Sequence, residues 1–546
     1  MRLSRRRFLE AGAAAVTLAP LAPALSAKRD APEFAASWES LTAHYRTPDW
    51  FRDAKFGIWA HWSAQCVPEQ GDWYARGMYL QGSPNYEFHV AHYGHPSKMG
   101  FMEIDRQWKA ERWEPQALME LYKAAGAKYF VSLANHHDNF DNYASRHHAW
   151  NSVRIGPKKD IVGTWAKVAR AAGLRFGVSN HSAHAWHWFQ PAYGYDGEGP
   201  LAGVRYDAAT LRASDGAGKW WEGLDPQELY TGPNIKMPDG IRGAAAVKAW
   251  QESHTGEWNE SPPPNNPEFV RKWSLRCLDL IDQHRPDLVY FDNTGLPLGQ
   301  AGLDVTAHYY NASRLWHDGR LEAVVNAKKL PPERRAALVE DIERGVSDEA
   351  RALPWQTDTC LGSWHYDRAL FERHGYKSAT TVIQMLADVV AKNGNLLLSV
   401  PIRGDGTIDA DERKILDELA AWMKVNGAAL FGTRPWKVFG EGPTRAAGGG
   451  FNEGKVAPYT AEDLRFTAHG PTLYALALEA PHGEMLTIKS LASDRVQGAI
   501  ERVELLGFAQ PLRYQATPVG LKIGLPAQRP ASGVCAFRIQ GRGLVS

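Results

Sequence analysis

Short apolar runs alternate with longer amphipathic stretches through most of this chain. Such alternation is typical of βα units, in which a helix leads from each strand to the next parallel strand. The apolar runs predict strands near residues 54–61, 129–136, 174–180, 287–293, 321–327, 355–361 and 395–401. Helices are predicted between them, at residues 115–125, 161–172, 269–284 and 378–392.

The chain has 546 residues, which is more than one hydrophobic core usually supports. We therefore expect two domains, an α/β domain followed by an all-β domain. The first, over residues 28–436, is a (β/α)8-like TIM barrel. The second, over residues 437–546, consists of β-branched and aromatic runs punctuated by Gly and Pro, and this pattern predicts an accessory antiparallel β-sandwich.

A long stretch at residues 182–266, rich in Gly, Pro and Trp, interrupts the alternation after the third predicted strand. Loops of this length are usually lids or binding insertions, and in a barrel this one lies over the active face. Its aromatic side chains either wall a sugar site or belong to a self-packed subdomain. They are Trp186, Trp188, Trp220 and Trp221.

Three of the predicted strands end in polar side chains. The first leads into His61, the second into His136, His137 and Asp138, and the fourth into Asp292. The carboxyl ends of barrel strands form one face of the fold, so these side chains are expected to converge on one pocket. The pattern indicates an enzyme with a His-lined cup and an aspartate at its centre.

Charge and composition argue against a nucleic-acid partner but do not decide whether the chain binds carbohydrate. Lys and Arg (62) balance Asp and Glu (61), so the chain lacks the basic surface that a nucleic-acid partner requires. The 21 tryptophans suit stacking on the apolar faces of sugars, and they suit a bulky barrel core equally well.

The four cysteines show no metal-binding spacing and no disulfide framework. Cys66 and Cys360 both follow predicted strands, which leaves one disulfide between them open.

Residues 1–27 have the pattern of a twin-arginine export signal. Ser4 to Leu9 carry the paired arginines, a modestly apolar stretch follows, and small residues precede residue 28. The apolar stretch is too short to span a bilayer. We expect a periplasmic or secreted protein with no membrane insertion after the signal is removed.

A series of motifs in fixed order resembles glycoside hydrolase family 29, the α-L-fucosidases. They lie at residues 54–62, 72–74, 127–130, 136–138, 150–153, 156–163, 285–292, 393–398, 426–427 and 432–436. The resemblance implies a TIM barrel with a C-terminal β-sandwich and hydrolysis of terminal α-L-fucosides with retention of configuration. It implies no metal and no organic cofactor.

Retention requires two carboxyl groups, one that attacks the anomeric carbon and one that protonates the leaving oxygen. By its position in the motif, Asp292 resembles the nucleophile of the family. The general acid/base precedes a Trp by about a dozen residues in the family, and Glu343 lies twelve residues before Trp355. Glu343 is therefore the predicted acid/base, with Glu340 and Glu349 as alternatives.

The resemblance also implies the residues that bind the sugar. His61, Trp73, His136 and His137 match positions that contact fucose in the family. The chain departs from the usual pattern at three further positions, where it has Asp72, Asn180 and Lys328. Apolar walls for the C6 methyl group are expected from Trp62 and Trp364.

A metal site at His136 and His137 is not expected. Adjacent residues of a strand point to opposite faces, so these two rings are not expected to hold one ion.

The sequence thus predicts an exo-acting retaining α-L-fucosidase that acts on a fucosylated oligosaccharide or glycoconjugate. Two alternatives stay open at this point. The same carboxylates could hydrolyse a related L-sugar such as an α-L-galactoside, or the chain could be a non-catalytic carbohydrate-binding homologue. An oligomer is compatible with the sequence.

Overall fold

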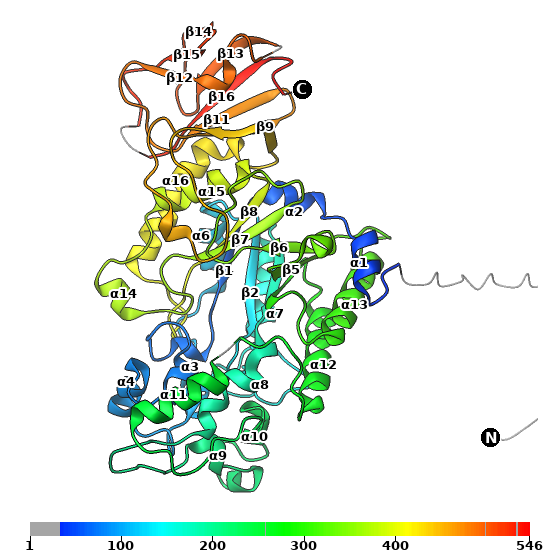
Figure 1. Cartoon of the computed structure of the whole chain (residues 1–546), viewed down its shortest axis with the longest axis vertical. Helices are drawn as coiled ribbons and strands as arrows, with labels where there is room; N and C mark the ends of the chain where they lie inside the picture. Colours follow the sequence, from blue (N-terminus) through cyan, green and yellow to red (C-terminus); the bar gives the residue numbers. More distant parts are fainter. Residues whose placement is uncertain (1–32, 257, 497, 531–532, 546) are drawn as a thin grey trace, which may run out of the picture. The chain divides into compact units, whose positions relative to one another are not determined.

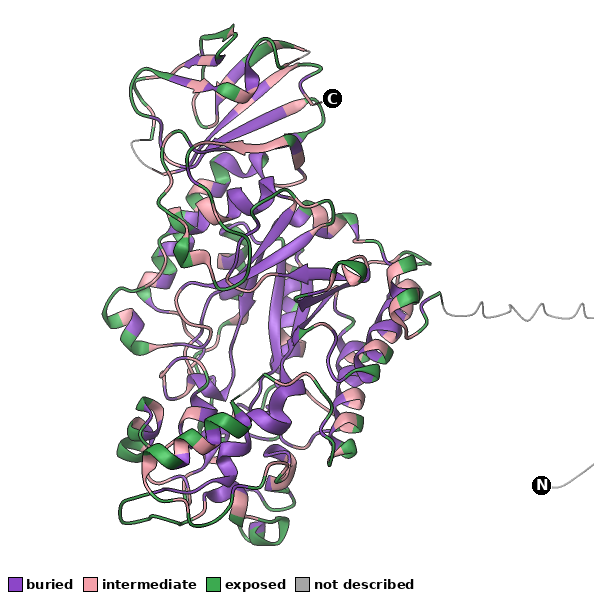
Figure 2. Cartoon of the chain, viewed as in Figure 1, coloured by how far each residue is buried: buried purple, intermediate pink, exposed green. Residues whose placement is uncertain are grey.

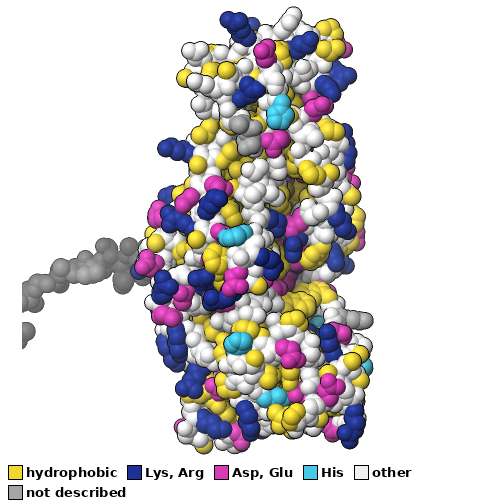
Figure 3. Space-filling model, turned by 90° about the vertical axis from the view of Figure 1, so that its left-hand side faces the viewer, with side chains coloured by type: hydrophobic (Ala, Val, Ile, Leu, Met, Phe, Trp, Pro, Cys, Tyr) yellow, Lys and Arg dark blue, Asp and Glu magenta, His cyan; other side chains and the backbone are white. Residues whose placement is uncertain are grey.

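The structure is a computed structural model, and it describes residues 33–545 apart from residues 257, 497 and 531–532. The export signal predicted at residues 1–27 lies outside the described residues and stays a prediction. Among the described helices, none is long and apolar enough to cross a membrane. Acidic and basic side chains are interspersed over the face drawn in Figure 3, as their balanced numbers suggest.

Eight parallel strands close into a barrel in chain order (Figure 1). They are β1 (Phe56–Ala60), β2 (Tyr129–Asn135), β3 (Arg175–Asn180), β4 (Leu288–Thr294), β5 (Val324–Lys328), β6 (Val339–Asp341), β7 (Trp355–Cys360) and β8 (Gly394–Ser399). The strands are buried almost throughout (Figure 2), because helices cover their outer face and side chains fill the interior. The predicted TIM barrel is confirmed.

Strand β6 is the one barrel strand that the apolar pattern does not predict. It has three residues, too few to show a period, and it pairs with β7 only through Asp341 and Gln356. On its other side it follows β5 from Asn326 to Lys328. This short strand places Glu343 just beyond its carboxyl end.

The four predicted helices are present as α6 (Pro115–Ala124), α7 (Ile161–Ala171), α12 (Pro267–His284) and α15 (Ala379–Ala391). Local sequence explains where two of them begin. The side chains of Asp160 and Ser378 accept hydrogen bonds from the first-turn amides of α7 and α15, which have no partner within the helix. The apolar sides of α7 and α15 then pack against β2, β3 and β8.

Further helices lie outside the predicted set. They are α1 (Trp38–His44), α2 (Asp49–Ala54), α3 (Tyr74–Gly77), α4 (Pro84–His92), α5 (Phe101–Gln107), α13 (Gln300–Trp316), α14 (Arg368–Glu372) and α16 (Ala410–Asn426).

The stretch at residues 182–266 contains short helices and a small core of its own. The helices are α8 (Ala185–Trp188), α9 (Asp207–Thr210), α10 (Pro226–Leu229) and α11 (Ala244–Thr255). Tyr195, Met237 and Val247 form the small core. The four tryptophans named for this stretch do not line the pocket described below, and three of them, Trp186, Trp188 and Trp221, are buried.

Two antiparallel sheets follow the barrel. The first has the order β13-β16-β11-β10-β9 and the second the order β12-β15-β14. The strands are β9 (Arg434–Glu441), β10 (Leu464–His469), β11 (Thr472–Ala477), β12 (Met485–Ile488), β13 (Ala499–Leu505), β14 (Tyr514–Thr517), β15 (Gly520–Gly524) and β16 (Cys535–Arg542). One apolar core joins the two sheets, which confirms the predicted β-sandwich.

The sandwich packs on the barrel through α15 and α16. The indole Nε1 of Trp422 in α16 donates to the carbonyl oxygen of Val534 at 2.8 Å. A buried ion pair joins Asp388 of α15 to Arg465 of β10. Strand β9 begins three residues before residue 437, where the second domain was expected to start.

The disulfide that the sequence left open is not formed. All four cysteines are buried free thiols, including Cys66 and Cys360. Burial raises the pKa of both thiols to about 12, so they stay protonated near neutral pH.

Candidate functional site

A cavity of about 850 Å³ opens at the carboxyl ends of the barrel strands. Seven of the predicted site residues and both predicted catalytic residues line it. They are His61, Asp72, Trp73, His136, His137, Lys328, Trp364, Asp292 and Glu343. The barrel therefore brings together side chains that lie up to three hundred residues apart in the sequence, as its geometry requires.

Asp292 is a buried carboxylate near the end of β4. Its Oδ2 atom lies 3.0 Å from Nδ1 of His181 and 3.3 Å from Nε2 of His137. Its Oδ1 atom contacts the ammonium group of Lys328. Burial raises the pKa of Asp292, but Lys328 and the two imidazoles outweigh burial and hold this pKa well below its usual range. Asp292 is ionised at neutral pH.

Glu343 follows β6 and shares Lys328 with Asp292, because the same ammonium nitrogen contacts both carboxylates. The pKa of Glu343 is raised to about 7, first by burial and then by the charges of Asp358 and Asp292, which exceed the opposing effect of Lys328. Two neighbouring carboxyl groups thus have pKa values shifted in opposite directions. This is the arrangement in which one group attacks as an anion and the other donates a proton.

The two alternative acid/base residues are placed differently. Glu340 accepts hydrogen bonds from Arg351 at 2.8 Å and from the amide of Leu330 at 3.0 Å, and it pairs with Arg335. Glu349 lies on the exposed wall of the cavity. Of these three glutamates, Glu343 is the one that shares a partner with Asp292.

Lys328, at the end of β5, carries the positive charge at the centre of the site. Burial lowers the pKa of Lys328, but the carboxylates of Asp292, Glu343 and Asp358 outweigh burial and hold this pKa well above its usual value. The side chain therefore stays in its ammonium form. Asp358 lies on β7, and its Oδ2 accepts a hydrogen bond from the hydroxyl of Tyr290 at 2.7 Å. Asp358 was not singled out from the sequence, although four of the six residues of β7 are polar, and that polarity in a buried strand is a signal that could have found it.

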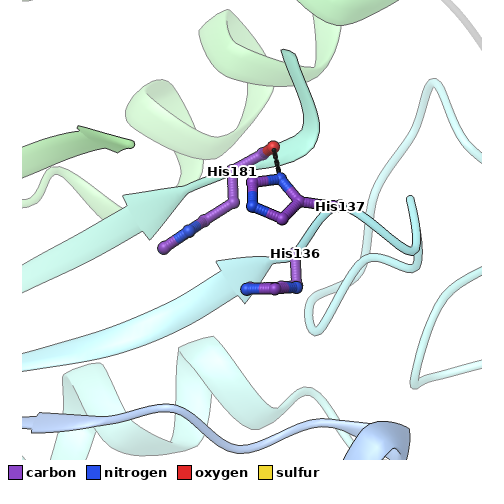
Figure 4. Close-up of side chains that lie close together, drawn as sticks. All are labelled: His136, His137 and His181. Carbon is purple, nitrogen blue, oxygen red and sulfur yellow. Dashed lines mark hydrogen bonds between the residues drawn. The ribbon is translucent and has the colours of Figure 1, made fainter. Parts of the chain in front are cut away.

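The histidines form a cluster on the β2 and β3 side of the cup (Figure 4). The rings of His136 and His137 lie 4.3 Å apart. The expectation that they point to opposite faces is wrong, because β2 ends at Asn135 and strand alternation no longer applies to them. His137 Nδ1 donates to the carbonyl oxygen of His181 at 2.7 Å.

Two groups of three side chains, both of which include His136, have ligand atoms close enough together that they could hold a metal ion. Ring nitrogens of His136, His137 and His181 lie within 4.8 Å of one another. The same holds for ligand atoms of Asp72, His136 and His365. Imidazole and carboxylate are suitable ligands for zinc. Of these residues, Asp72, His136, His137 and His181 line the cavity that also holds Asp292.

Asn180 does not reach the cup, which corrects the prediction that it contacts the sugar. Its side chain points outward to α12, where it accepts from Trp273 at 3.2 Å and donates to Cys277 at 3.6 Å. The next residue, His181, lies just past the end of β3 and lines the cavity instead.

His181, one residue after the predicted Asn180, is the side chain that lines the cavity. Burial lowers its pKa to about 4, so the ring is neutral at neutral pH. Because Nδ1 faces the Asp292 carboxylate, that nitrogen carries the proton. Nε2 is then an acceptor, and among the described residues it has no hydrogen-bond partner.

Trp62 also differs from its predicted role. It packs in the core against Trp108 and Trp113, and its Nε1 donates to the carbonyl oxygen of Arg403. Trp364 does line the cup, beside Trp59 and His61.

The rim of the cavity carries exposed tryptophans. Trp73 is 39% exposed and has a positive φ of 62°, an uncommon backbone conformation for a bulky residue. Trp258 is 38% exposed, and the centre of its ring lies 3.6 Å from that of His184, with the two rings tilted by 38°. Glu260 fixes this segment, since its carboxylate accepts from the Asn293 side chain and the Thr294 amide, each at 2.6 Å. Trp258 was missed because the sequence offers no period around it.

A family model for the alpha-L-fucosidases matches residues 21–428, which is well over half of the chain. The chain belongs to the α-L-fucosidase family. A second model, for the alpha-L-fucosidase C-terminal domain, matches residues 458–540, within the two antiparallel sheets. The chain is accordingly a glycoside hydrolase, and its family hydrolyses α-L-fucosides.

Individual relatives agree with this assignment. The human tissue alpha-L-fucosidase is 26% identical over 530 residues, which cover 94% of this chain and 93% of the relative. The bovine tissue alpha-L-fucosidase is 26% identical over 521 residues, covering 92% and 89%. The crystal structure of Thermotoga maritima alpha-fucosidase with a mechanism-based inhibitor superposes with a TM-score of 0.66 at 25% identity, covering 92% of this chain and 99% of that fucosidase.

Proposed function

We propose that the protein is an exo-acting α-L-fucosidase that retains the configuration of the sugar, with Asp292 as nucleophile and Glu343 as general acid and base. One observation carries the proposal. Asp292 and Glu343 contact the same ammonium group, while the pKa of the first is lowered and that of the second is raised. Retaining glycosidases need this closeness, with carboxyl groups about 5–5.5 Å apart.

In the first step the Asp292 carboxylate attacks the anomeric carbon of a terminal fucose. The bond from that carbon to the leaving oxygen breaks, and Glu343 gives its proton to that oxygen. A pKa of about 7 keeps a large fraction of Glu343 protonated near neutral pH, while Asp292 stays ionised. The products are a fucosyl ester of Asp292 and the free leaving group.

In the second step Glu343, now ionised, takes a proton from a water molecule. The resulting oxygen attacks the anomeric carbon, and the ester bond to Asp292 breaks. Both steps invert the anomeric carbon, so the released fucose has the α configuration of the substrate. His181 and His137 hold the Asp292 carboxylate in place before attack and receive it again afterwards.

The cup supplies donors and acceptors for the sugar hydroxyl groups. Nε2 of His181 is a free acceptor at the edge of Asp292, and the rings of His61 and His136 line the same space. Trp364 supplies an apolar surface for the sugar. A buried nucleophile at the strand ends admits the end of a glycan, which supports an exo action on terminal fucose.

Proton NMR of the reaction as it starts tests this proposal. The purified enzyme is mixed with p-nitrophenyl α-L-fucoside, and the anomeric signal of the first fucose released is followed before mutarotation. Retention predicts that α-L-fucose appears first and β-L-fucose only later. If β-L-fucose appeared first, the double displacement through Asp292 would be wrong.

Lys328 sets the pH range of the reaction, and replacing it should move both limbs of the pH profile. In the native enzyme kcat/KM should fall as the pH rises through about 7, where Glu343 loses its proton. In Lys328→Gln the positive charge that lowers both carboxyl pKa values is gone. Both limbs should therefore move to higher pH, and the acid limb should enter the measurable range.

The measurement is kcat/KM on an aryl α-L-fucoside between pH 3 and 10. Lys424→Gln is the matched control, because Lys424 is an exposed lysine in the last turn of α16 and does not line the cavity. Its limbs should stay where the native enzyme has them. An unchanged profile in Lys328→Gln would show that Lys328 does not control the two carboxyl groups.

A further inference from the structure

A segment of the C-terminal part of the chain reaches into the catalytic cavity. Residues 448–453, hereafter the 448–453 segment, lie between β9 and β10 of the five-stranded sheet. Four of them, Gly448, Gly449, Gly450 and Phe451, line the same cavity as Asp292 and Glu343. The proposed mechanism assigns this segment no task.

The 448–453 segment is hydrogen-bonded along its backbone to the loop that carries Glu343. Phe451 N donates to the carbonyl oxygen of Glu343 itself at 2.8 Å. Gly449 and Val346 exchange two backbone hydrogen bonds, at 2.9 and 3.2 Å. The amides of residues 452 and 453 both donate to the carbonyl oxygen of Arg344, each at 3.1 Å.

Glycine makes this close approach possible. A Cβ atom on Gly345 would lie 2.3 Å from the carbonyl oxygen of Gly449, which is closer than atoms can approach. Gly449 itself has a φ of 130°, a conformation that other residues rarely adopt. The two chain segments therefore fit together only because both have glycine at the contact.

Glu453 anchors the end of the segment. Its buried carboxylate accepts from Nε of Arg344 at 2.8 Å and from Oγ1 of Thr359 at 2.6 Å. It also pairs with Lys377 at 3.1 Å. Burial raises the pKa of Glu453, but Lys377, Thr359 and Arg344 together lower it below its usual value, so the anchor stays charged.

These contacts hold the large apolar side chain of Phe451 at the cavity, where it does not pack into an apolar core. Phe451 is 61% exposed and has a positive φ of 53°. Within the described part of the chain it belongs to none of the apolar clusters. A left-handed backbone costs free energy at a residue other than glycine, and such strain is found mainly at functional positions.

The location of Phe451 indicates what it binds. In the proposed function Glu343 protonates the oxygen of the leaving group, so the leaving group must lie on the Glu343 side of the cavity. The backbone of Phe451 is bonded to Glu343 on that side. Aromatic rings pack well against flat apolar surfaces, and the C–H face of a sugar ring is such a surface.

We propose that the ring of Phe451 binds the leaving group of the substrate. The leaving group that it binds is the sugar ring to which the fucose is attached. The inference rests on the proposed function, since it uses Glu343 to define the leaving-group side. The C-terminal part of the chain then contributes to substrate choice: it selects glycans in which a second sugar ring follows the fucose.

Two substrates separate this site from the catalytic one. α-L-Fucosyl fluoride has no ring in its leaving group, whereas a fucosyl disaccharide has a sugar ring there. Phe451→Ala should raise KM for the disaccharide about three- to tenfold, the range of one aromatic contact, and leave kcat/KM for the fluoride unchanged. Phe451→Tyr, which keeps the ring, should behave as the native enzyme with both substrates.

Leu315→Ala is the control, because Leu315 is an apolar side chain on α13 that is 85% exposed and does not line the cavity. This variant should change neither KM for the disaccharide nor kcat/KM for the fluoride. Equal effects of Phe451→Ala on both substrates, or no effect on the disaccharide, would overturn the leaving-group site. Hydrolysis of neither substrate by the native enzyme would overturn the proposed function itself, so the two failures can be told apart.

Discussion

Asp292→Gly should hydrolyse p-nitrophenyl α-L-fucoside at least about 10⁴-fold more slowly than the native enzyme, since removal of a nucleophile costs about 10⁴- to 10⁶-fold in kcat. In the proposed mechanism this buried carboxylate attacks the anomeric carbon, and Lys328, His137 and His181 all contact it. Without it, no ester can form. Initial rates at saturating substrate measure the effect.

Azide gives this variant a distinct product. A small anion can occupy the space of the missing side chain and attack the anomeric carbon from the same side as Asp292. The product should be β-L-fucosyl azide, which NMR identifies. Asp282→Asn on α12, with an exposed carboxylate, is the control and should keep native rates. A native rate in Asp292→Gly would remove Asp292 from the mechanism.

Glu343→Ala should have an effect that depends on the leaving group. A general acid contributes about 10²- to 10⁴-fold, and it matters most when the leaving oxygen is a poor one. We expect a loss of that size in kcat/KM on a fucosyl disaccharide and a much smaller loss on an aryl fucoside. Azide should partly restore turnover, now with α-L-fucosyl azide as the product, because it attacks the fucosyl ester in place of water.

The neighbouring glutamates provide matched controls for this variant. Glu349→Ala removes an exposed carboxylate and should leave both substrates unaffected. Glu340→Gln breaks ion pairs with Arg351 and Arg335, so it should lower the melting temperature. Any change that it causes in kcat/KM should be the same for the disaccharide and the aryl fucoside. If either of these variants showed the leaving-group dependence and Glu343→Ala did not, the acid/base would be misassigned.

Much of this architecture could be predicted from sequence because buried parallel strands give continuous apolar runs. Seven of the eight barrel strands were predicted, including β7, in which four of the six residues are polar. Strand β6 is too short to give it, although it places Glu343. The predicted Glu343 rested on spacing to Trp355, and the contact with Lys328 supports that choice on independent grounds.

The errors have a common physical origin. Asn180 is the last residue of β3 and points outward, whereas His181, the first residue beyond that strand, lines the cavity. His136 and His137 likewise lie past the end of β2, so alternation was applied to them where it does not hold. Strand ends are the least certain feature of a sequence pattern, and the site is built from them.

Contacts between distant segments lie beyond sequence patterns altogether. Trp258 reaches the cup because Glu260 binds the end of β4, and Phe451 reaches it because the 448–453 segment pairs with the Glu343 loop. Neither segment shows the hydrophobic periodicity of a helix or strand. No local sequence pattern predicts which distant segment each of them contacts. The export signal at residues 1–27 stays a prediction, which cell fractionation can test.

The central claim is that the Asp292 carboxylate bonds covalently to fucose during turnover. A 2-deoxy-2-fluoro fucosyl fluoride forms this ester but slows its hydrolysis, so mass spectrometry of a protease digest can locate the label. The account predicts one fluorofucosyl group per chain, attached to Asp292. A label on another residue, or turnover of the reagent with no labelled state at any time, would contradict it.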